Sequence, residues 1–496
     1  MQVCPPPRRR ARRPAWRSPG LAVWLGLGLA AAPGSLRAEE WAIAGARYQG
    51  LGGAGVAAAH GAAAARWNPG ALGFESDVFE VEVPLGVTLV AEGDLLEHGV
   101  RLYNFLERND YEDVLDKIDA QQTLSETEVQ QTLVFATRAV TGFTEREQGG
   151  FGFGDAGLSL RRGRFVLSAR GEAMVGGDPR LDLNGIPGTD NDFMLGDVIQ
   201  TSVDRTALFT NPGSPVLASA LVAAAPDLSQ AQAEEIAYQA EQAGIDTADP
   251  GVQNVLTSIA AGSGDGQNQT GVRVRGLYTK EIAISGGLPL LDDRVALGFS
   301  LKYLHGTTVN KVILADDDES RSIETADRRR SRQMAVDFGV MVQPTDWLRI
   351  GVSVRNANRP RFKTRGGSDL VLDAQVRAGL AMQLSERWLV AADLDLVEND
   401  YETLRRISSQ SLAIGTEYRV GFLGRSVELR AGMRRDLADG RGDVAVVTAG
   451  LGFYFGLYNF DLAMASSLER EDIDNFAPDI PGRLDLALTL RYSTEF

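Results

Sequence analysis

Apolar and polar residues alternate without interruption over Leu484–Phe496, the last thirteen residues of the chain. Every even-numbered position from Leu484 to Tyr492 is leucine or tyrosine, whereas three odd-numbered positions of this segment carry charges. A period of two places these residues on opposite faces of a β-strand. One face suits lipid and the other a polar lumen, so the pattern is typical of a strand that closes a transmembrane β-barrel.

The same period recurs in fourteen segments, an even number, as in bacterial outer-membrane barrels. Most of them approach the about 9–11 residues that a tilted strand needs to cross the hydrocarbon layer. The predicted strands are Val78–Val90, Asp155–Arg162, Phe165–Val175, Val272–Ser285, Val295–His305, Met334–Gln343, Leu348–Arg355, Leu372–Leu384, Trp388–Val397, Ser411–Val420, Val427–Arg434, Val444–Phe455, Tyr458–Ser466 and Leu484–Phe496.

The connections between these segments alternate between short and long. Short connections lie at 163–164, 286–294, 344–347, 385–387, 421–426 and 456–457, and the two longest at 91–154 and 176–271. Short periplasmic turns alternating with long extracellular loops place both termini in the periplasm. We therefore predict an all-β fold, an antiparallel transmembrane β-barrel of about 14 strands that occupies residues 78–496.

The two longest loops contain good helix formers with helical spacing. The predicted helices are Leu95–Glu107, Ser125–Val140 and Ser229–Ala243. They predict a cap of short helices at the extracellular mouth, and disordered surface loops are the alternative.

The N-terminus has the organisation of a secretory signal peptide. Arginines crowd the region 8–17, an apolar stretch covers Leu21–Ala32, and Ala38 precedes an acidic residue. This predicts a signal peptide over residues 1–38 and, together with the strands, a location in the bacterial outer membrane. Cys4, the single cysteine, would be removed with it, so thiol chemistry and cysteine metal sites are excluded.

Charge narrows the range of partners. The chain has a net charge of −16, and loss of the seven arginines in residues 1–38 would bring it to −23. Nucleic acid is therefore excluded as an expected ligand, because its phosphates need a basic surface. Lipid of the outer membrane is the expected surrounding of the barrel.

Charged residues on the predicted lumen face occur at positions that pair across strands. Opposite charges there stabilise strand pairing by about 0.2–1 kcal/mol per pair. The favoured interpretation is structural ion pairs in the lumen, and a charged permeation path is the alternative. The predicted pairs are Glu417 with Arg430, Arg419 with Glu428, Asp337 with Arg355 and Arg377 with Asp395.

Residues 39–77 are rich in glycine and alanine, a composition that suits a segment packed inside a barrel. The motif residues of this predicted N-terminal plug are Gly52, Gly53, Gly55, Asn68, Pro69 and Gly70. A glycine-rich stretch followed by Asn-Pro just before the first strand resembles the N-terminal hatch of the FadL-like superfamily of outer-membrane barrels. Gly70 departs from the alanine that is usual there.

Within that superfamily the chain resembles the TraF-type conjugal transfer protein family. The likeness rests on Gly50–Leu72, Asp337–Asn356, Leu389–Asp400 and Leu429–Phe453. It implies an outer-membrane barrel linked by name to conjugation. The thioredoxin-like protein that is also called TraF is a different protein, and its redox chemistry needs cysteines that residues 39–496 lack.

The C-terminal strand also resembles the segment of bacterial outer-membrane barrels that ends on phenylalanine. This resemblance implies that the barrel assembly machinery is a partner that reads the strand as an insertion signal. The signal residues are Leu488, Leu490, Tyr492 and Phe496.

Three other patterns resemble cofactor, metal or catalytic sites but lack a feature that such a site needs. Gly50-x-Gly52-x-x-Gly55 lacks the preceding strand and the βαβ unit of a dinucleotide site, so no cofactor is predicted. The acidic groups at 190–192 and 316–319 lack the spacing of a calcium loop, so no metal is predicted. The histidines His60, His98 and His305 have no identifiable catalytic partner, and the chain is not predicted to be an enzyme.

Two functional hypotheses remain. The first is a FadL-like channel for small hydrophobic or amphipathic molecules, with the plug as its gate. The second is a non-transporting envelope component that supports conjugation or surface assembly, with conjugation proteins as partners. Fold alone does not decide between them.

Overall fold

The structure is a computed structural model of the whole chain. It describes residues 41–495, apart from 76, 93–103, 106–108, 110, 121, 144–148, 181–195, 197–198, 200, 202–204, 262–270, 315–326, 366–368, 402–406, 423–424, 439–444, 469 and 474–476. The predicted signal peptide, the helix at Leu95–Glu107, both acidic loop groups, His98 and Phe496 lie wholly or largely outside the described residues.

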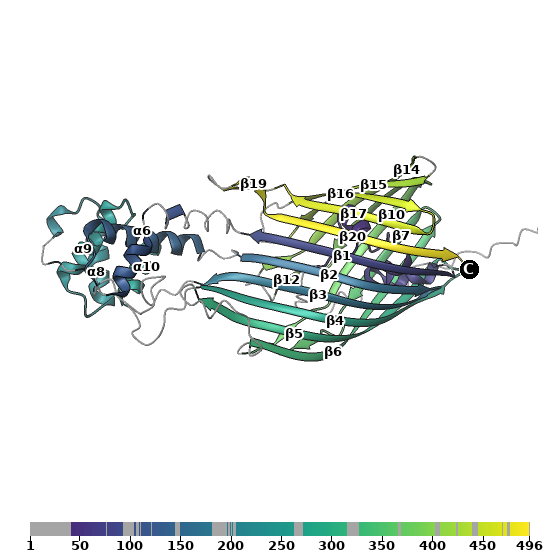
Figure 1. Cartoon of the computed structure of the whole chain (residues 1–496), viewed down its shortest axis with the longest axis horizontal. Helices are drawn as coiled ribbons and strands as arrows, with labels where there is room; N and C mark the ends of the chain where they lie inside the picture. The colour runs from purple at the N-terminus through teal and green to yellow at the C-terminus, as the bar shows by residue number, and fades with distance from the viewer. Residues whose placement is uncertain are drawn as a thin grey trace, which may run out of the picture. The chain divides into compact units, whose positions relative to one another are not determined.

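Fourteen antiparallel strands form a closed barrel, as the alternating pattern predicted (Figure 1). The last strand closes the sheet by pairing with the first, from Val78 opposite Glu495 to Val90 opposite Arg483. In barrel order the strands are β1 Val78–Glu92, β2 Gly149–Arg162, β3 Phe165–Arg180, β4 Gly271–Leu290, β5 Val295–Leu314, β6 Arg328–Thr345, β7 Leu348–Arg355, β10 Gln375–Ser385, β11 Trp388–Asp395, β14 Ser411–Phe422, β15 Arg425–Asp436, β16 Ala445–Phe455, β17 Tyr458–Ser467 and β20 Arg483–Glu495.

The strands β2 to β6 are longer than predicted. Strands β4 and β5 pair over twenty positions, and the connection expected at 286–294 shrinks to a turn at 291–294. Leu291, Asp292 and Asp293 in that turn have positive φ. The period of two fades toward the long-loop ends of β2, β3, β5 and β6 and toward the short-turn end of β4, so the pattern underestimated these strands.

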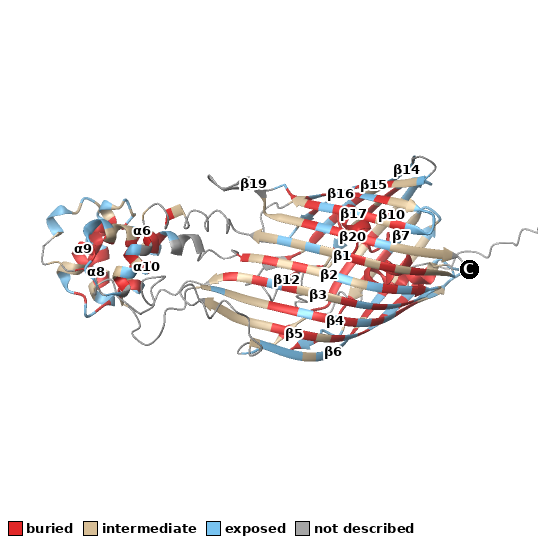
Figure 2. Ribbon diagram, in the orientation of Figure 1, coloured by how far each residue is buried: buried red, intermediate tan, exposed pale blue. Residues whose placement is uncertain are grey.

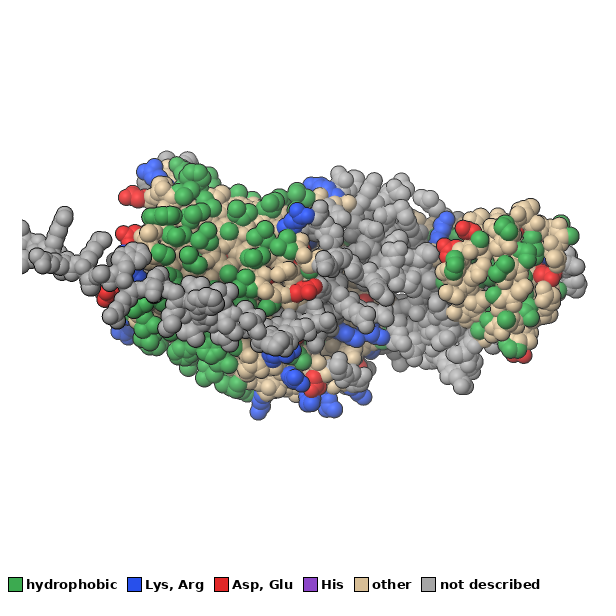
Figure 3. Space-filling model, turned by 180° about the vertical axis from the view of Figure 1, so that it is seen from behind, with side chains coloured by type: hydrophobic (Ala, Val, Ile, Leu, Met, Phe, Trp, Pro, Cys, Tyr) green, Lys and Arg blue, Asp and Glu red, His purple; other side chains and the backbone are tan. Residues whose placement is uncertain are grey.

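The two faces of the barrel differ in chemistry. Figure 2 shows buried and exposed residues alternating along the strands, and Figure 3 shows hydrophobic side chains covering the visible outer surface of the barrel. Leu486 and Leu490 of β20 are about half exposed, whereas Asp485 and Thr489 are buried on the inner face. The apolar side chains thus face outward and the polar ones inward, the arrangement of a transmembrane barrel.

The loops carry structure that sequence periodicity found only in part. The predicted helices at Ser125–Val140 and Ser229–Ala243 correspond to α6 Glu126–Phe143 and α9 Gln230–Gln242. Short two-stranded ribbons pair β8 Arg361–Phe362 with β9 Leu370–Val371, β12 Asn399–Tyr401 with β13 Ile407–Ser409, and β18 Arg470–Ile473 with β19 Ala477–Pro481. Further loop helices with described bounds are α5 Tyr111–Asp119, η3 Thr206–Leu208, α8 Gly213–Ala224 and α10 Pro250–Ala261.

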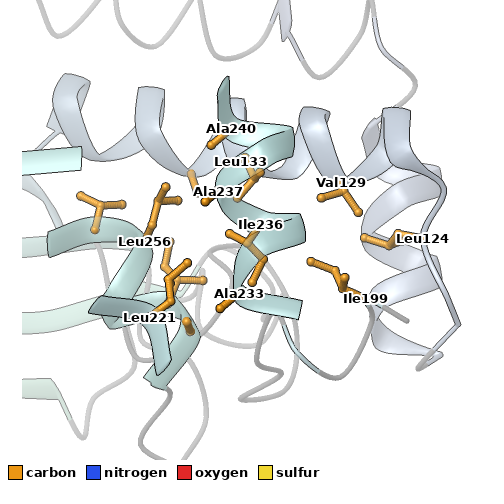
Figure 4. Packing of buried hydrophobic residues seen from close by; sticks show 14 of the residues in the cluster. Leu124, Val129, Leu133, Ile199, Leu221, Ala233, Ile236, Ala237, Ala240 and Leu256 are labelled. Atoms are coloured by element: carbon orange, nitrogen blue, oxygen red, sulfur yellow. The ribbon is translucent and has the colours of Figure 1, made fainter. Parts of the chain in front are cut away.

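The loop helices have a hydrophobic core of their own. Leu133, Ile236 and Leu256 come from α6, α9 and α10 and belong to one buried cluster (Figure 4). Ser229 begins α9 with a capping box, in which its side chain and that of Gln232 each bond the other residue's backbone. No described helix is both long enough and apolar enough to cross a membrane.

Candidate functional site

Residues 41–74, called the plug below, run through short helical turns before β1. They form α2 Ala46–Gly50, η1 Gly61–Ala63, α3 Ala64–Trp67 and η2 Pro69–Phe74. The plug has a small aromatic core, in which the rings of Tyr48 and Trp67 lie 4.9 Å apart and Trp67 Nε1 donates to the Ala44 carbonyl at 3.0 Å. Nearly all plug residues are buried, because the inner face of the barrel surrounds them.

Asn68 fixes the turn that leads from the plug to β1. Its Oδ1 accepts from the Gly70 backbone N–H at 2.9 Å and caps η2, which begins with Pro69. Its Nδ2 donates to the Val340 carbonyl of β6 at 3.0 Å. One side chain therefore sets both the local turn and its attachment to the barrel wall.

A buried charge network joins the plug to the wall. Arg47 of α2 binds Glu417 of β14 with two bonds, Nε to Oε2 at 2.7 Å and Nη2 to Oε1 at 3.0 Å. Arg430 of β15 shares Glu417 at 2.8 Å and also donates to Asp461 at 2.6 Å and to Glu428. Paired, hydrogen-bonded charges are the form in which ions are tolerated away from water.

Asp393 of β11 holds the plug at a second place. Its Oδ2 accepts from the backbone N–H groups of Gly55 and Val56, both at 2.8 Å. Two backbone N–H groups that have no partner in a helix thus donate to the same carboxylate. Hydrogen bonds to a charged acceptor are stronger than those to a neutral one. Asp393 was not predicted, because its alternation with leucine marks only an inward-facing residue.

Glycines on the inner wall allow the plug backbone to approach the strands closely. A Cβ on Gly298 would lie 2.0 Å from the Pro69 carbonyl carbon, and one on Gly415 would lie 2.2 Å from the Leu51 carbonyl oxygen. A Cβ on Gly432 would lie 2.4 Å from Gly52 N. The track of wall glycines beneath the plug is Gly287, Gly298, Gly339, Gly351, Gly379, Gly415, Gly432 and Gly450.

The predicted plug glycines have separate roles. Gly52 and Gly53 have φ of 72° and 95°, in the left-handed region that favours glycine. Gly55 lies against Trp67, whose ring atoms would stand 2.3 Å from an added Cβ. Close packing and the left-handed backbone account for all three glycines.

Three of the four predicted lumen pairs are brought together by the strand register. Glu417 lies opposite Arg430, Arg419 opposite Glu428 and Arg377 opposite Asp395. Arg377 Nε and Nη2 reach the two Asp395 oxygens at 2.5 and 2.9 Å. Arg377 also lies over the ring of Trp41, 4.9 Å from its centroid, so this pair belongs to the surroundings of the plug.

The fourth predicted pair, Asp337 with Arg355, follows the β6–β7 register, in which Phe338 lies opposite Val354, but the two side chains form no ion pair in the described structure. Asp337 Oδ1 instead binds Lys302 Nζ at 2.7 Å and accepts from Asn356 N at 2.8 Å. The guanidinium of Arg355 stands 4.7 Å from the ring centroid of Trp41. The prediction used two neighbouring strands alone, whereas Lys302 comes from β5 and Trp41 from the plug.

The predicted insertion residues lie on the closing strand. Leu488, Leu490 and Tyr492 share the outward face of β20, with Leu490 46% exposed, and the ring of Tyr492 lies 5.2 Å from that of Tyr458. This places them toward lipid. Recognition by the assembly machinery stays a prediction.

Histidine 60 lies in a positive environment at the start of η1. The guanidinium of Arg47, together with burial and the more distant Arg491 and Arg349, holds the pKa of His60 well below its usual range, against the opposing charge of Glu417. His60 is therefore neutral when the protein is folded at neutral pH. Its backbone N–H lies 3.4 Å from the Tyr48 hydroxyl oxygen.

We expect His60 to make the folded protein less stable in mild acid. Because its folded pKa is lowered, the unfolded chain binds a proton first as pH falls through the unfolded pKa of about 6.5, and stability is lost below that value. The fall in urea midpoint between pH 7.5 and pH 5.5 should be smaller in His60→Gln than in the wild type. Equal falls in both proteins would contradict this assignment, because carboxylates titrate alike in the two chains.

Apolar side chains line part of the lumen on the long-loop side. Phe153 of β2, Met174 of β3 and Leu277 of β4 face inward and are buried. Phe362 of β8 is fully buried against Gly306 of β5. The complete luminal apolar cluster is Phe151, Phe153, Met174, Leu277, Leu304, Ala335, Phe362 and Leu370, and Ala42 of the plug packs against it.

The described residues show no group of three His, Cys, Asp or Glu side chains that could hold a metal ion. His60 belongs to the plug, and His305 lies on the outward face of β5 opposite Lys280 and Arg332. Among the residues that the structure describes, the barrel interior contains a closely packed plug, buried ion pairs and an apolar lining.

Residues 99–395, more than half of the chain, match the protein family described as "F plasmid transfer operon, TraF, protein". The chain belongs to this TraF family. The match includes Asp337–Asn356, one of the stretches on which the resemblance rested, and excludes Gly50–Leu72 and Leu429–Phe453.

Solved structures with a similar fold are distant in sequence. The toluene transporter TbuX of Ralstonia pickettii is 12% identical with a TM-score of 0.44, over 91% of this chain and 98% of that one. The toluene transporter TodX of P. putida is 14% identical with a TM-score of 0.45, over the same shares. A FadL homologue of Pseudomonas aeruginosa is 12% identical with a TM-score of 0.43, again over 91% and 98%. No curated protein matches the chain.

Proposed function

We propose that this TraF-family protein is a channel of the bacterial outer membrane for small hydrophobic or amphipathic molecules. The plug acts as its gate. The luminal apolar cluster is the observation that carries the proposal. A barrel that only conducted ions or water would need no inward-facing apolar side chains on five neighbouring strands, since barrel interiors are ordinarily polar.

The position of the apolar cluster supports a path that ends at the plug. Ala42 packs against the cluster, and the neighbouring Trp41 lies against Arg355 and Arg377. A hydrophobic solute that enters from the long-loop side would leave water along Phe153 and Leu277 and then meet the plug. Apolar burial favours such entry by about 25 cal/mol per Å² of surface removed from water.

The attachments of the plug suit a gate. Its backbone is held at separate places by Asp393, Thr448 and Thr489, through hydrogen bonds of 2.8 to 3.1 Å. Each such bond contributes about 0.5–3 kcal/mol net, so a modest rearrangement can release one place while the others hold.

The family name supports a second candidate, a non-transporting envelope component that supports conjugation, with conjugation proteins as partners. In that case the buried charges and the plug would stabilise a scaffold, and the loop helices with their separate core would offer a surface to partners. The two candidates differ in whether solute flux depends on the plug.

Flux through liposomes tests the channel. Purified protein should admit a small fluorescent aromatic probe faster than empty liposomes do, and Asp393→Ala should raise the rate several-fold, because Gly55 and Val56 lose their shared acceptor. Asp346→Ala is the matched control, since this carboxylate is 94% exposed in a turn. A charged sugar of similar size reports non-selective leakage.

The flux measurement distinguishes the channel from the envelope component. Probe flux that rises in Asp393→Ala and stays unchanged in Asp346→Ala supports the gated channel. Flux at the level of empty liposomes for all three proteins, with reduced mating by donor cells that carry Asp393→Ala, supports the envelope component and overturns the channel.

A further inference from the structure

Five basic side chains gather on the outward face of three neighbouring strands. Lys280 of β4, His305 of β5 and Arg332 of β6 stand directly opposite one another in the sheet. Arg330 and Arg328 follow on the same face of β6, opposite Thr307 and Val309. Lys280 and the three arginines are exposed. These five residues are called the cationic patch below.

The cationic patch begins where the apolar surface of the barrel ends. The residues one step closer to the short turns on the same face are Ile282, Tyr303 and Met334, which are 56%, 43% and 47% exposed. Tyr278 lies on the other side of Lys280, whose Nζ is 5.8 Å from its ring centroid. The surface thus changes from apolar to cationic within two residues, with tyrosines at the border, as at a membrane–water interface. Figure 3 shows Lys and Arg side chains gathered at the border of the hydrophobic surface.

Three members of the patch have no ion-pair partner among the residues that the structure describes. Residues two apart on one face of a strand lie about 7 Å apart, so the three arginines of β6 repel one another. Within the described part of the chain, Lys280, Arg330 and Arg332 have no carboxylate in an ion pair, whereas the nearby acids Asp327 and Asp369 bind Lys311 and Lys363. Among the described residues these three clustered cations thus have no carboxylate partner, which makes them available to an external anion.

We propose that the cationic patch binds the phosphate groups of an outer-leaflet glycolipid whose acyl chains lie on the apolar surface below. Arginine suits this role because its planar fork donates two bonds to one phosphate, and the hydroxyl of Thr307 stands between Tyr278 and Arg330 as a further donor. The proposal rests on the proposed outer-membrane location, which places the long-loop end in the leaflet that faces outward. It concerns the outer wall and is independent of the lumen.

Lipid binding by the purified, delipidated full-length protein tests this site. Native mass spectrometry in detergent would measure the affinity for lipopolysaccharide with a phosphorylated lipid A and for the same lipid after dephosphorylation. The triple variant Lys280→Gln, Arg330→Gln, Arg332→Gln should bind the phosphorylated lipid on the order of a hundredfold more weakly, because each cation near a lipid surface contributes roughly fivefold. Dephosphorylation should weaken wild-type binding to a similar extent.

The control removes three exposed arginines from the short-turn end of the barrel, in Arg164→Gln, Arg387→Gln, Arg425→Gln. It changes the net charge equally and should bind as the wild type does. Equal binding by the two triple variants, or equal binding of phosphorylated and dephosphorylated lipid, overturns the proposal. Equally tight binding of phosphatidylglycerol or of inorganic phosphate shows a general anion site and overturns the assignment to a glycolipid.

Probe flux separates this site from the proposed channel. The triple variant of the cationic patch should pass the aromatic probe at the wild-type rate in liposomes, since none of its residues faces the lumen. Weaker lipid binding by the triple variant, together with a wild-type rate of probe flux, supports the lipid site as separate from the channel. If the wild type passes no probe but still binds the lipid, the proposed channel is overturned and the proposed lipid site is supported.

Discussion

Replacing Arg430 by leucine should destabilise the folded barrel by about 3–5 kcal/mol, a large fraction of the stability of an ordinary domain. The Arg430 side chain is fully buried and donates to Glu417, Glu428 and Asp461, all of which are buried as well. Its loss leaves three carboxylates near one another, with Arg47 on Glu417 and with Arg419 and the Tyr454 hydroxyl on Glu428. Urea-induced unfolding in lipid vesicles, followed by tryptophan fluorescence, measures the change.

Arg419→Leu is the matched control for this prediction. Arg419 is on the neighbouring strand and also binds Glu428, but its side chain is 50% exposed. Water screens an exposed pair, so its loss should cost less than about 1 kcal/mol. Similar costs for the two variants would show that the network is hydrated and that its burial contributes little.

Placing a methyl group on the wall glycines should expel the plug from its seat. In Gly298→Ala and Gly415→Ala the new Cβ would overlap backbone atoms of Pro69 and Leu51, at 2.0 and 2.2 Å. Backbone cannot move aside as a flexible side chain can, so we expect a loss of about 1–3 kcal/mol or more in each variant. Protease cleavage within residues 41–74 should become faster while the barrel still forms, since its strand pairing is unchanged.

Gly421→Ala provides the comparison within the strand that carries Gly415. An added Cβ there meets no atom within 4 Å. It should leave both the urea midpoint and the cleavage rate at wild-type values. Rapid cleavage in Gly421→Ala, or none in Gly298→Ala, would contradict close contact between plug and wall.

The sequence predicted the barrel well because one physical signal repeats along it. Each strand needs one face for lipid and one for the lumen, which produces alternation within a few residues. The alternation in Leu348–Arg355 predicted the bounds of β7 without reference to the rest of the chain. The ribbons β8–β9, β12–β13 and β18–β19 are too short to show a period. The ends of β2–β6 lie where that demand weakens.

The plug site was harder to predict, because its contacts join distant parts of the chain. Glycine and alanine indicated close packing in residues 39–77, and Asn68 was singled out for its turn. Nothing local distinguishes Asp393, which caps the plug backbone, from Asp395, which pairs with Arg377. The eight wall glycines did leave a trace, since each of eight strands carries a glycine on its inward face, but β5 and β16 carry a second one, Gly306 and Gly452, that does not touch the plug.

The first helix of the plug, α2, is held by the last strand of the barrel. Ala46 N donates to Thr489 Oγ1 at 2.9 Å across 443 positions, and Gln49 Nε2 donates to Asp485 at 3.1 Å across 436. Contacts of such separation form late, because the intervening chain must first be ordered. Strand β20 both closes the cylinder against β1 and holds α2 of the plug, so we expect closure of the barrel and seating of the plug to be coupled in one late step.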